Sequence, residues 1–137
     1  MANAAAPSAR SIDAALWAAT ALSGGLTVYL SLGPIPPGAG AFPNSDKVWH
    51  ALFYGVTTFL FLLAAVWRPG RGPGPFPRAG LVGIGLILVA GGVVEALQGV
   101  VTEYRKPELL DWIAELLGVT VALGALALLR RSTERRP

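Results

Sequence analysis

Four long apolar stretches constrain this chain more than any other feature. A helix needs about 20 apolar residues to cross a hydrocarbon core of about 30 Å, and the stretches at residues 14–32, 48–67, 79–101 and 109–129 each meet that requirement. The connections between them are short and rich in glycine and proline, which interrupt helices. The sequence therefore predicts one all-α domain over residues 1–137, a polytopic membrane protein built as a bundle of four transmembrane helices with short loops.

The composition supports a membrane environment. Hydrophobic residues make up 53% of the chain and charged residues only 14%, whereas a soluble domain carries about 25% charged residues. So few charges cannot cover a water-exposed surface, and membrane lipids are the expected partners. The chain has no cysteine, which excludes disulfides and thiolate metal sites.

The positive charges predict an orientation. If the helices alternate in direction, eight lysine and arginine residues fall on the side that holds both termini and three fall on the other. Because short cytoplasmic loops are enriched in lysine and arginine, we expect both termini to be cytoplasmic and the protein to be a multi-pass protein of the cytoplasmic (inner) membrane. This placement also accounts for the net charge of +3 without a nucleic-acid partner. The basic tail at 130–137 is expected to follow the last span.

The first stretch admits another interpretation. Residues 39–41, Ala-Gly-Ala, loosely resemble a signal-peptide cleavage site. The apolar run before them is longer than the about 7–15 residues typical of a signal peptide, which favours a retained first span.

Polar side chains within the last three stretches gather at one depth, near the extracytoplasmic end. Residues three or four apart share a helix face, so each stretch presents one polar stripe, and ionisable groups in spans rarely face lipid. We therefore expect a single cluster that faces the bundle interior and opens to the outer side. Its members are Asp46 and Lys47 just before the second stretch, His50 and Tyr54 within it, Glu95 and Gln98 in the third, Arg105 in the connection, and Asp111 and Glu115 in the fourth.

A purely structural role is the alternative for these residues. Polar side chains stabilise contacts between membrane helices, typically by about 0.6 kcal/mol per hydrogen bond, and Asp46 is suited to capping a helix. His50 and Glu95 lie deeper, where an ionisable residue is a functional hypothesis by default. Glu95 has no charged neighbour in sequence, so we expect it to pair with His50 or Arg105.

Two spaced motifs resemble those of the VanZ-like family. The first is Asp46-Lys47-x-x-His50-x-x-x-Tyr54, and the second is Glu95-x-x-Gln98 followed by Arg105, Asp111 and Gly118. The resemblance covers residues 46–118. It implies a membrane protein of the cell envelope, from a family named after a protein associated with low-level teicoplanin resistance, and it implies no reaction. The family usually has asparagine where this chain has Glu115, which adds a negative charge.

Two classes of function remain open from the sequence. A non-enzymatic protein would bind a lipid-linked or glycopeptide-like ligand, or a partner, at the outer face, where Arg105 is suited to gripping a phosphate or carboxylate. An intramembrane hydrolase or transferase acting on an envelope lipid would use His50 as general acid or base, oriented by Asp46 or Glu95, with Tyr54 stabilising an oxyanion.

A metal site is a third possibility. His50 with Asp46, Glu95 and Glu115 offers one nitrogen and several oxygen ligands, a set that suits a divalent ion. No compact metal-binding motif is present, so the sequence favours no metal and no cofactor. Small residues four apart, as at Gly118 and Ala122, permit close helix contact and leave the oligomeric state open.

Overall fold

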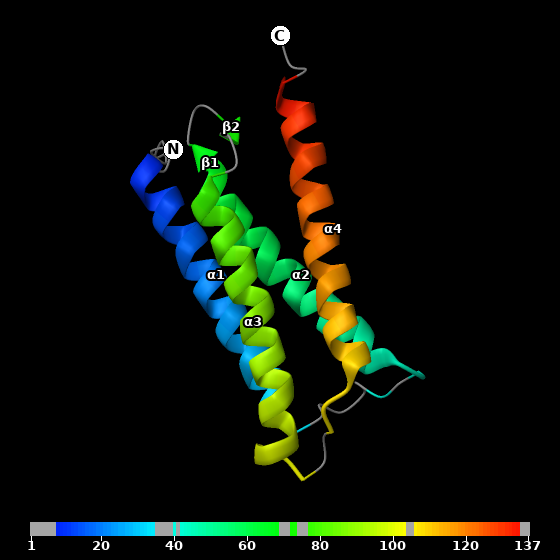
Figure 1. The fold of residues 1–137 in the computed structure, drawn as a ribbon. Helices are drawn as coiled ribbons and strands as arrows, with labels where there is room; N and C mark the ends of the chain where they lie inside the picture. Colours follow the sequence, from blue (N-terminus) through cyan, green and yellow to red (C-terminus); the bar gives the residue numbers. More distant parts are fainter. Residues whose placement is uncertain are drawn as a thin grey trace, which may run out of the picture.

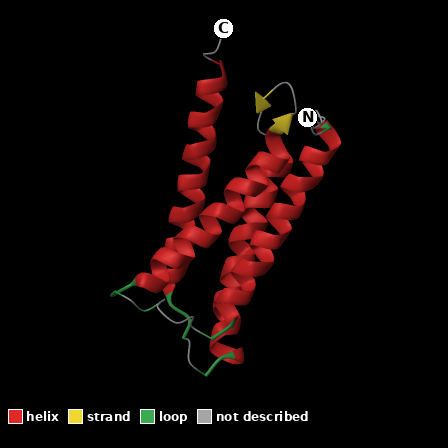
Figure 2. Cartoon of the chain, turned by 180° about the vertical axis from the view of Figure 1, so that it is seen from behind, coloured by secondary structure: helices red, strands yellow, loops and turns green. Residues whose placement is uncertain are grey.

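The computed structural model of the chain describes residues 8–34, 40, 42–68, 72–73, 77–103 and 106–134. These residues form four helices, and a two-residue antiparallel ladder lies in the connection between the second and third (Figures 1 and 2). Each helix is long and apolar enough to span a membrane, which confirms the predicted all-α fold. The elements are α1 (Ala9–Leu32), α2 (Ser45–Val66), β1 (Trp67–Arg68), β2 (Gly72–Pro73), α3 (Arg78–Val101) and α4 (Leu109–Glu134).

The helix ends differ from the predicted spans for local reasons. α2 begins at Ser45, because Asn44 adopts a left-handed φ of 62° and its carbonyl accepts the first hydrogen bond, from Lys47 N at 3.1 Å. α4 extends five residues past 129, since the basic residues there are good helix formers and favour a helix C-terminus. Pro107 lies two residues before the first residue of α4.

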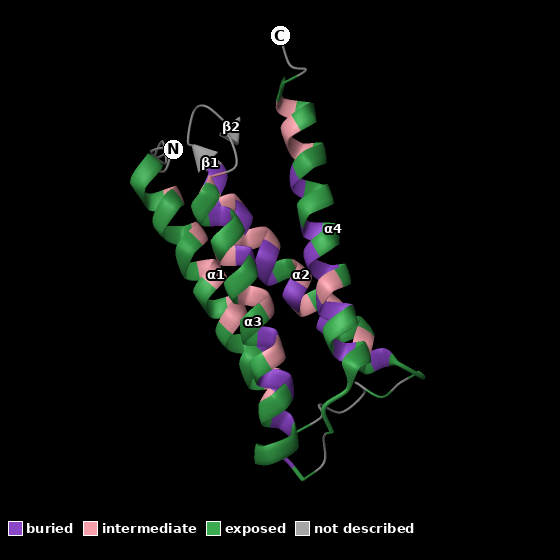
Figure 3. Ribbon diagram, in the orientation of Figure 1, coloured by how far each residue is buried: buried purple, intermediate pink, exposed green. Residues whose placement is uncertain are grey.

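The distribution of burial is that of a protein surrounded by lipid. Most residues of the helices are exposed or only partly buried (Figure 3). Large apolar side chains lie on the outer surface, for example Leu22 at 74% and Leu86 at 63% exposure, while the buried set includes many polar side chains. Such continuous apolar surface is rare on soluble monomers. The described residues therefore form a multi-pass membrane protein whose polar groups face inward.

α2 is the central helix of the bundle. It packs most extensively against α4 and next against α1. Gly118 permits the close contact with α4, because a Cβ at this position would collide with the backbone of α2 at the Ala51 carbonyl and the Gly55 nitrogen. The small residues of α4 thus bring two helices of the same chain together, in the way that such residues do in membranes.

The two ends of the bundle differ in character. Near the β1–β2 ladder an apolar core forms from Leu62, Val66, Ile84, Val119, Ala122 and Leu126. The start of α1 and the end of α4 lie at this same end of the molecule (Figure 1). The buried ionisable residues lie toward the opposite end, close to the connection between α3 and α4. The fold thereby concentrates charge at one end, which we call the connection end.

Candidate functional site

The ionisable residues of the connection end form two adjacent groups. The first, the Lys47 cluster, consists of Lys47, Asp46, Glu108 and Asp111. The second, the buried triad, consists of His50, Glu95 and Glu115.

In the Lys47 cluster one ammonium group binds three carboxylates. Lys47 Nζ lies 2.6 Å from Asp46 Oδ2, 2.7 Å from Glu108 Oε2 and 2.8 Å from Asp111 Oδ1. The Lys47 side chain is 15% exposed and that of Asp111 8%, while the other two are half exposed. Since Lys47 lies in the first turn of α2 and Asp111 in that of α4, the cluster joins the starts of these helices.

Glu108 belongs to this cluster although it was absent from the predicted site. Its position just before a helix, three residues ahead of Asp111, is one where acidic side chains are favoured, and this signal was available in the sequence. Asp46 lies inside the first turn of α2 and its carboxylate binds Lys47.

The buried triad brings together one residue from each of α2, α3 and α4. His50, Glu95 and Glu115 each place one potential metal-binding atom within 4.8 Å of the other two. His50 Nδ1 lies 3.7 Å from Glu115 Oε1. All three residues are buried, and Glu115 has no exposed surface at all.

Most polar atoms of the triad lack a hydrogen-bond partner. Glu95 Oε1 accepts a hydrogen bond from Glu108 N at 2.6 Å. Among the described residues no partner exists for Glu95 Oε2, for either oxygen of Glu115, or for His50 Nδ1. An unsatisfied buried polar group costs about 1–3 kcal/mol, and such groups call for an explanation, such as an ion or a catalytic role.

Among the described residues, Glu95 forms no ion pair of the kind that we expected. Its carboxylate accepts a hydrogen bond from the Glu108 backbone, and His50 makes its ion-pair contact with Glu115. The expected alternative partner, Arg105, lies outside the described residues.

Tyr54 and Gln98, also predicted for the site, have different surroundings. The Tyr54 ring is nearly parallel to the His50 ring, at 9° with centroids 6.3 Å apart, so it packs beside the triad. The Gln98 side chain donates to the Ser31 carbonyl at 3.0 Å and thereby joins α3 to the last turn of α1.

Gly91 provides the space for the Glu115 carboxylate. A Cβ on Gly91 would collide with Glu115 Oε2 and would approach Tyr54 Cε1 to 3.0 Å. A glycine at this point of α3 thus lets a carboxylate from α4 reach the interior of the bundle.

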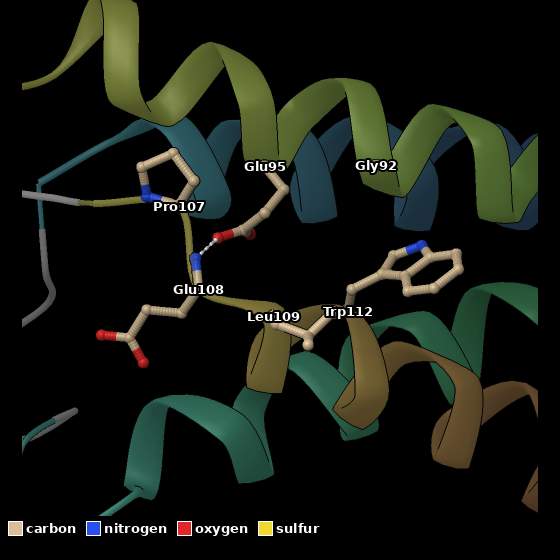
Figure 4. Close-up of a pocket in the computed structure, with 6 residues that line it drawn as sticks. All are labelled: Gly92, Glu95, Pro107, Glu108, Leu109 and Trp112. Atoms are coloured by element: carbon tan, nitrogen blue, oxygen red, sulfur yellow. Dashed lines mark hydrogen bonds between the residues drawn. The ribbon is translucent and has the colours of Figure 1, made fainter.

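A pocket of about 210 Å³ adjoins the triad (Figure 4). Its lining comes from α3, from the α3–α4 connection and from the start of α4, and consists of Gly92, Glu95, Pro107, Glu108, Leu109 and Trp112. The Glu95 side chain reaches toward the Glu108 backbone, and the Trp112 indole lies across the pocket near Gly92 (Figure 4). Glu95 is therefore shared by the pocket and the triad.

The fold and site define a class: a multi-pass membrane protein with a buried His/Glu/Glu triad next to a pocket at one end of the bundle. Comparison with models of known families, with curated proteins and with solved structures finds no match to this chain. The function must accordingly be argued from the site.

Proposed function

We propose that this chain is a VanZ-like integral membrane protein of the cell envelope that binds a lipid-linked or glycopeptide-like ligand on the extracytoplasmic side. The observation that carries the proposal is the pocket between α3 and α4, whose wall includes the buried Glu95. The motif residues Lys47, His50 and Asp111 lie in the two groups around it. A connection with teicoplanin-type resistance is part of the proposal and rests on the motif resemblance alone.

The lining of the pocket suits an amphipathic ligand. Leu109 and Trp112 are exposed apolar side chains, and the pocket lies at the end of two spans, the depth at which head groups meet acyl chains. Tryptophan favours this boundary because its ring is apolar and its N–H is polar. A ligand with a hydrocarbon chain and a head group that hydrogen-bonds Glu95 fits these features.

Tryptophan fluorescence tests the proposal directly. A Trp112-only protein, made with phenylalanine at the other three tryptophans, is reconstituted in lipid nanodiscs and titrated with a polyprenyl phosphate or with teicoplanin. We expect a saturable change with at least one probe, because Trp112 lines the pocket. A Trp17-only protein is the matched control, since Trp17 packs on Phe61 and does not line the pocket. No response from folded Trp112-only protein, or equal responses from both proteins, would refute pocket binding.

An intramembrane acid/base enzyme is the second candidate, and the His50–Glu115 contact of 3.7 Å favours it. A carboxylate beside a histidine orients the ring and stabilises its protonated form, as a general base requires. Glu115 takes the orienting role that the sequence had suggested for Asp46 or Glu95, because Asp46 is engaged by Lys47.

Product analysis separates the two candidates. Reconstituted protein is incubated with envelope lipid extract, and the lipids are analysed by mass spectrometry. An enzyme would convert lipid over many turnovers and lose this activity in His50→Gln, whereas a binding protein would leave the lipids unchanged.

A further inference from the structure

We propose that His50, Glu95 and Glu115 form a binding site for one divalent transition-metal ion of the Zn²⁺ or Mn²⁺ class. The proposal is independent of the proposed function, because metal binding can be measured without a ligand or a substrate. It revises the expectation of no metal that the sequence favoured.

The charges of the triad favour a divalent cation. Two carboxylates lie buried with a single imidazole, and among the described residues neither carboxylate forms an ion pair with a lysine or an arginine. Lys47 is occupied by three other carboxylates. Buried charges in proteins are paired or coordinate metals. One divalent ion neutralises both glutamates while His50 stays neutral, and a neutral imidazole is the form that binds metal.

The geometry is close to that of a coordination site. Ligand atoms at about 2.0–2.2 Å from a tetrahedral Zn²⁺ ion stand about 3.3–3.6 Å apart, and the separation of His50 Nδ1 from Glu115 Oε1 is already 3.7 Å. The three donor atoms lie within 4.8 Å of one another, so rotations of the side chains would bring them to coordination distances.

The free atoms are those that a metal would need. His50 Nδ1, Glu95 Oε2 and both Glu115 oxygens have no hydrogen-bond partner among the described residues, so these atoms are available to a metal ion. The Tyr54 hydroxyl lies close enough to interact with Glu115 and can orient that carboxylate. The bond from Glu108 N to Glu95 Oε1 orients the Glu95 carboxylate, in the way that outer hydrogen bonds orient metal ligands. One imidazole and two carboxylates suit Zn²⁺ and Mn²⁺ better than ions that prefer oxygen alone.

The three carboxylates of the Lys47 cluster differ from those of the buried triad, because they already have a cation. Asp46, Glu108 and Asp111 also lie within 4.8 Å of one another, but Lys47 binds all three. This group therefore already holds its cation and serves as an internal control. An ion in the triad, next to the pocket that shares Glu95, would add an attraction for a phosphate head group.

The test uses the full chain without an affinity tag, purified in detergent and stripped with a chelator. Titration with Co²⁺, followed by its visible absorption, is expected to show one ion per chain that Zn²⁺ displaces. We expect Glu115→Gln and Glu95→Gln to weaken binding at least tenfold and Asp46→Asn to leave it unchanged. The proposal is overturned if the wild-type protein binds no stoichiometric Co²⁺, or if both glutamine variants bind like the wild type.

X-ray absorption of the Zn²⁺-loaded wild-type protein provides a readout that needs no variant. His50 is the sole histidine of the chain, so an imidazole ligand in the tag-free protein identifies it. We expect one imidazole among oxygen ligands. A spectrum with oxygen ligands alone would overturn the assignment even if the variants fail to fold.

Discussion

At the scale of single residues, Glu115 is the residue whose surroundings most strongly indicate a binding role. It is fully buried, and both of its oxygens lack a hydrogen-bond partner among the described residues. Its carboxylate occupies space that a Cβ on Gly91 would fill. Its ion-pair contact among the described residues is with His50 Nδ1, at 3.7 Å. A side chain in this state reduces the stability of the fold, so its presence is better explained by what it binds.

Replacing Glu115 with an apolar side chain of similar length tests this argument. We predict that Glu115→Met leaves the thermal stability of chelator-treated protein unchanged or raises it, by about 1–3 kcal/mol in free energy of unfolding, because an unsatisfied buried group is removed. Replacement of buried ionic groups by apolar ones is often neutral or stabilising. The measurement is thermal unfolding in detergent. A clear loss of stability would mean that the carboxylate supports the fold itself.

At the scale of helices, α2 and α4 form the structural centre through two contacts of opposite chemistry. Gly55 and Gly118 let the two backbones approach closely, and Lys47 joins the first turns of both helices through Asp111. The first contact is steric and sits within the spans, whereas the second is electrostatic and sits at their end. We therefore expect substitutions at the two contacts to lower the stability of the protein for different physical reasons.

The steric contact is tested by adding one methyl group. Gly118→Ala should destabilise the protein by about 1–3 kcal/mol, the usual cost of overpacking, because the new Cβ meets backbone atoms of α2 that cannot move aside. Gly124→Ala, on the same helix with no atom within 4 Å of its Cβ, is the matched control. The two variants are compared by thermal unfolding in detergent, and equal stability would contradict a tight α2–α4 crossing.

The electrostatic contact is tested at Lys47. Lys47→Met should lower the free energy of unfolding by about 1–3 kcal/mol, because it leaves Asp111 buried without its cation and leaves three neighbouring carboxylates without a cation. The loss should shrink as pH falls and the carboxylates take up protons. Unfolding measured at several pH values checks this. A loss independent of pH would assign the effect to packing of the lysine stem.

At the scale of the whole molecule, the orientation in the membrane stays a prediction. The start of α1, the end of α4 and the β1–β2 ladder share one end of the bundle (Figure 1). The eight-to-three division of lysine and arginine favours the cytoplasm for that end. Because the chain has no cysteine, maleimide labelling of a variant with one introduced cysteine reports on that position alone. In intact cells a cysteine at Gly40 should react with an impermeant maleimide and one at Gly72 should not. The reverse pattern would invert the topology and place the pocket on the cytoplasmic side.

The sequence predicted the helices well because hydropathy and proline-rich connections are local signals. It also grouped His50, Glu95 and Glu115 by depth, since depth follows from counting residues along a helix. It did not predict that His50 faces Glu115 more closely than Glu95, or that Gln98 turns to Ser31. These contacts depend on how each helix is rotated about its axis, and helices that are apolar on nearly every face carry little information about rotation.

The pocket between α3 and α4 has a consequence for how binding is measured. A ligand that carries a hydrocarbon chain resides in the bilayer, so it meets this pocket by diffusing in the membrane plane. The relevant concentration is then the mole fraction of ligand among lipids, not its amount per volume of buffer. An apparent dissociation constant expressed per litre should rise in proportion as lipid or detergent is added at fixed protein. The same data expressed per lipid should coincide.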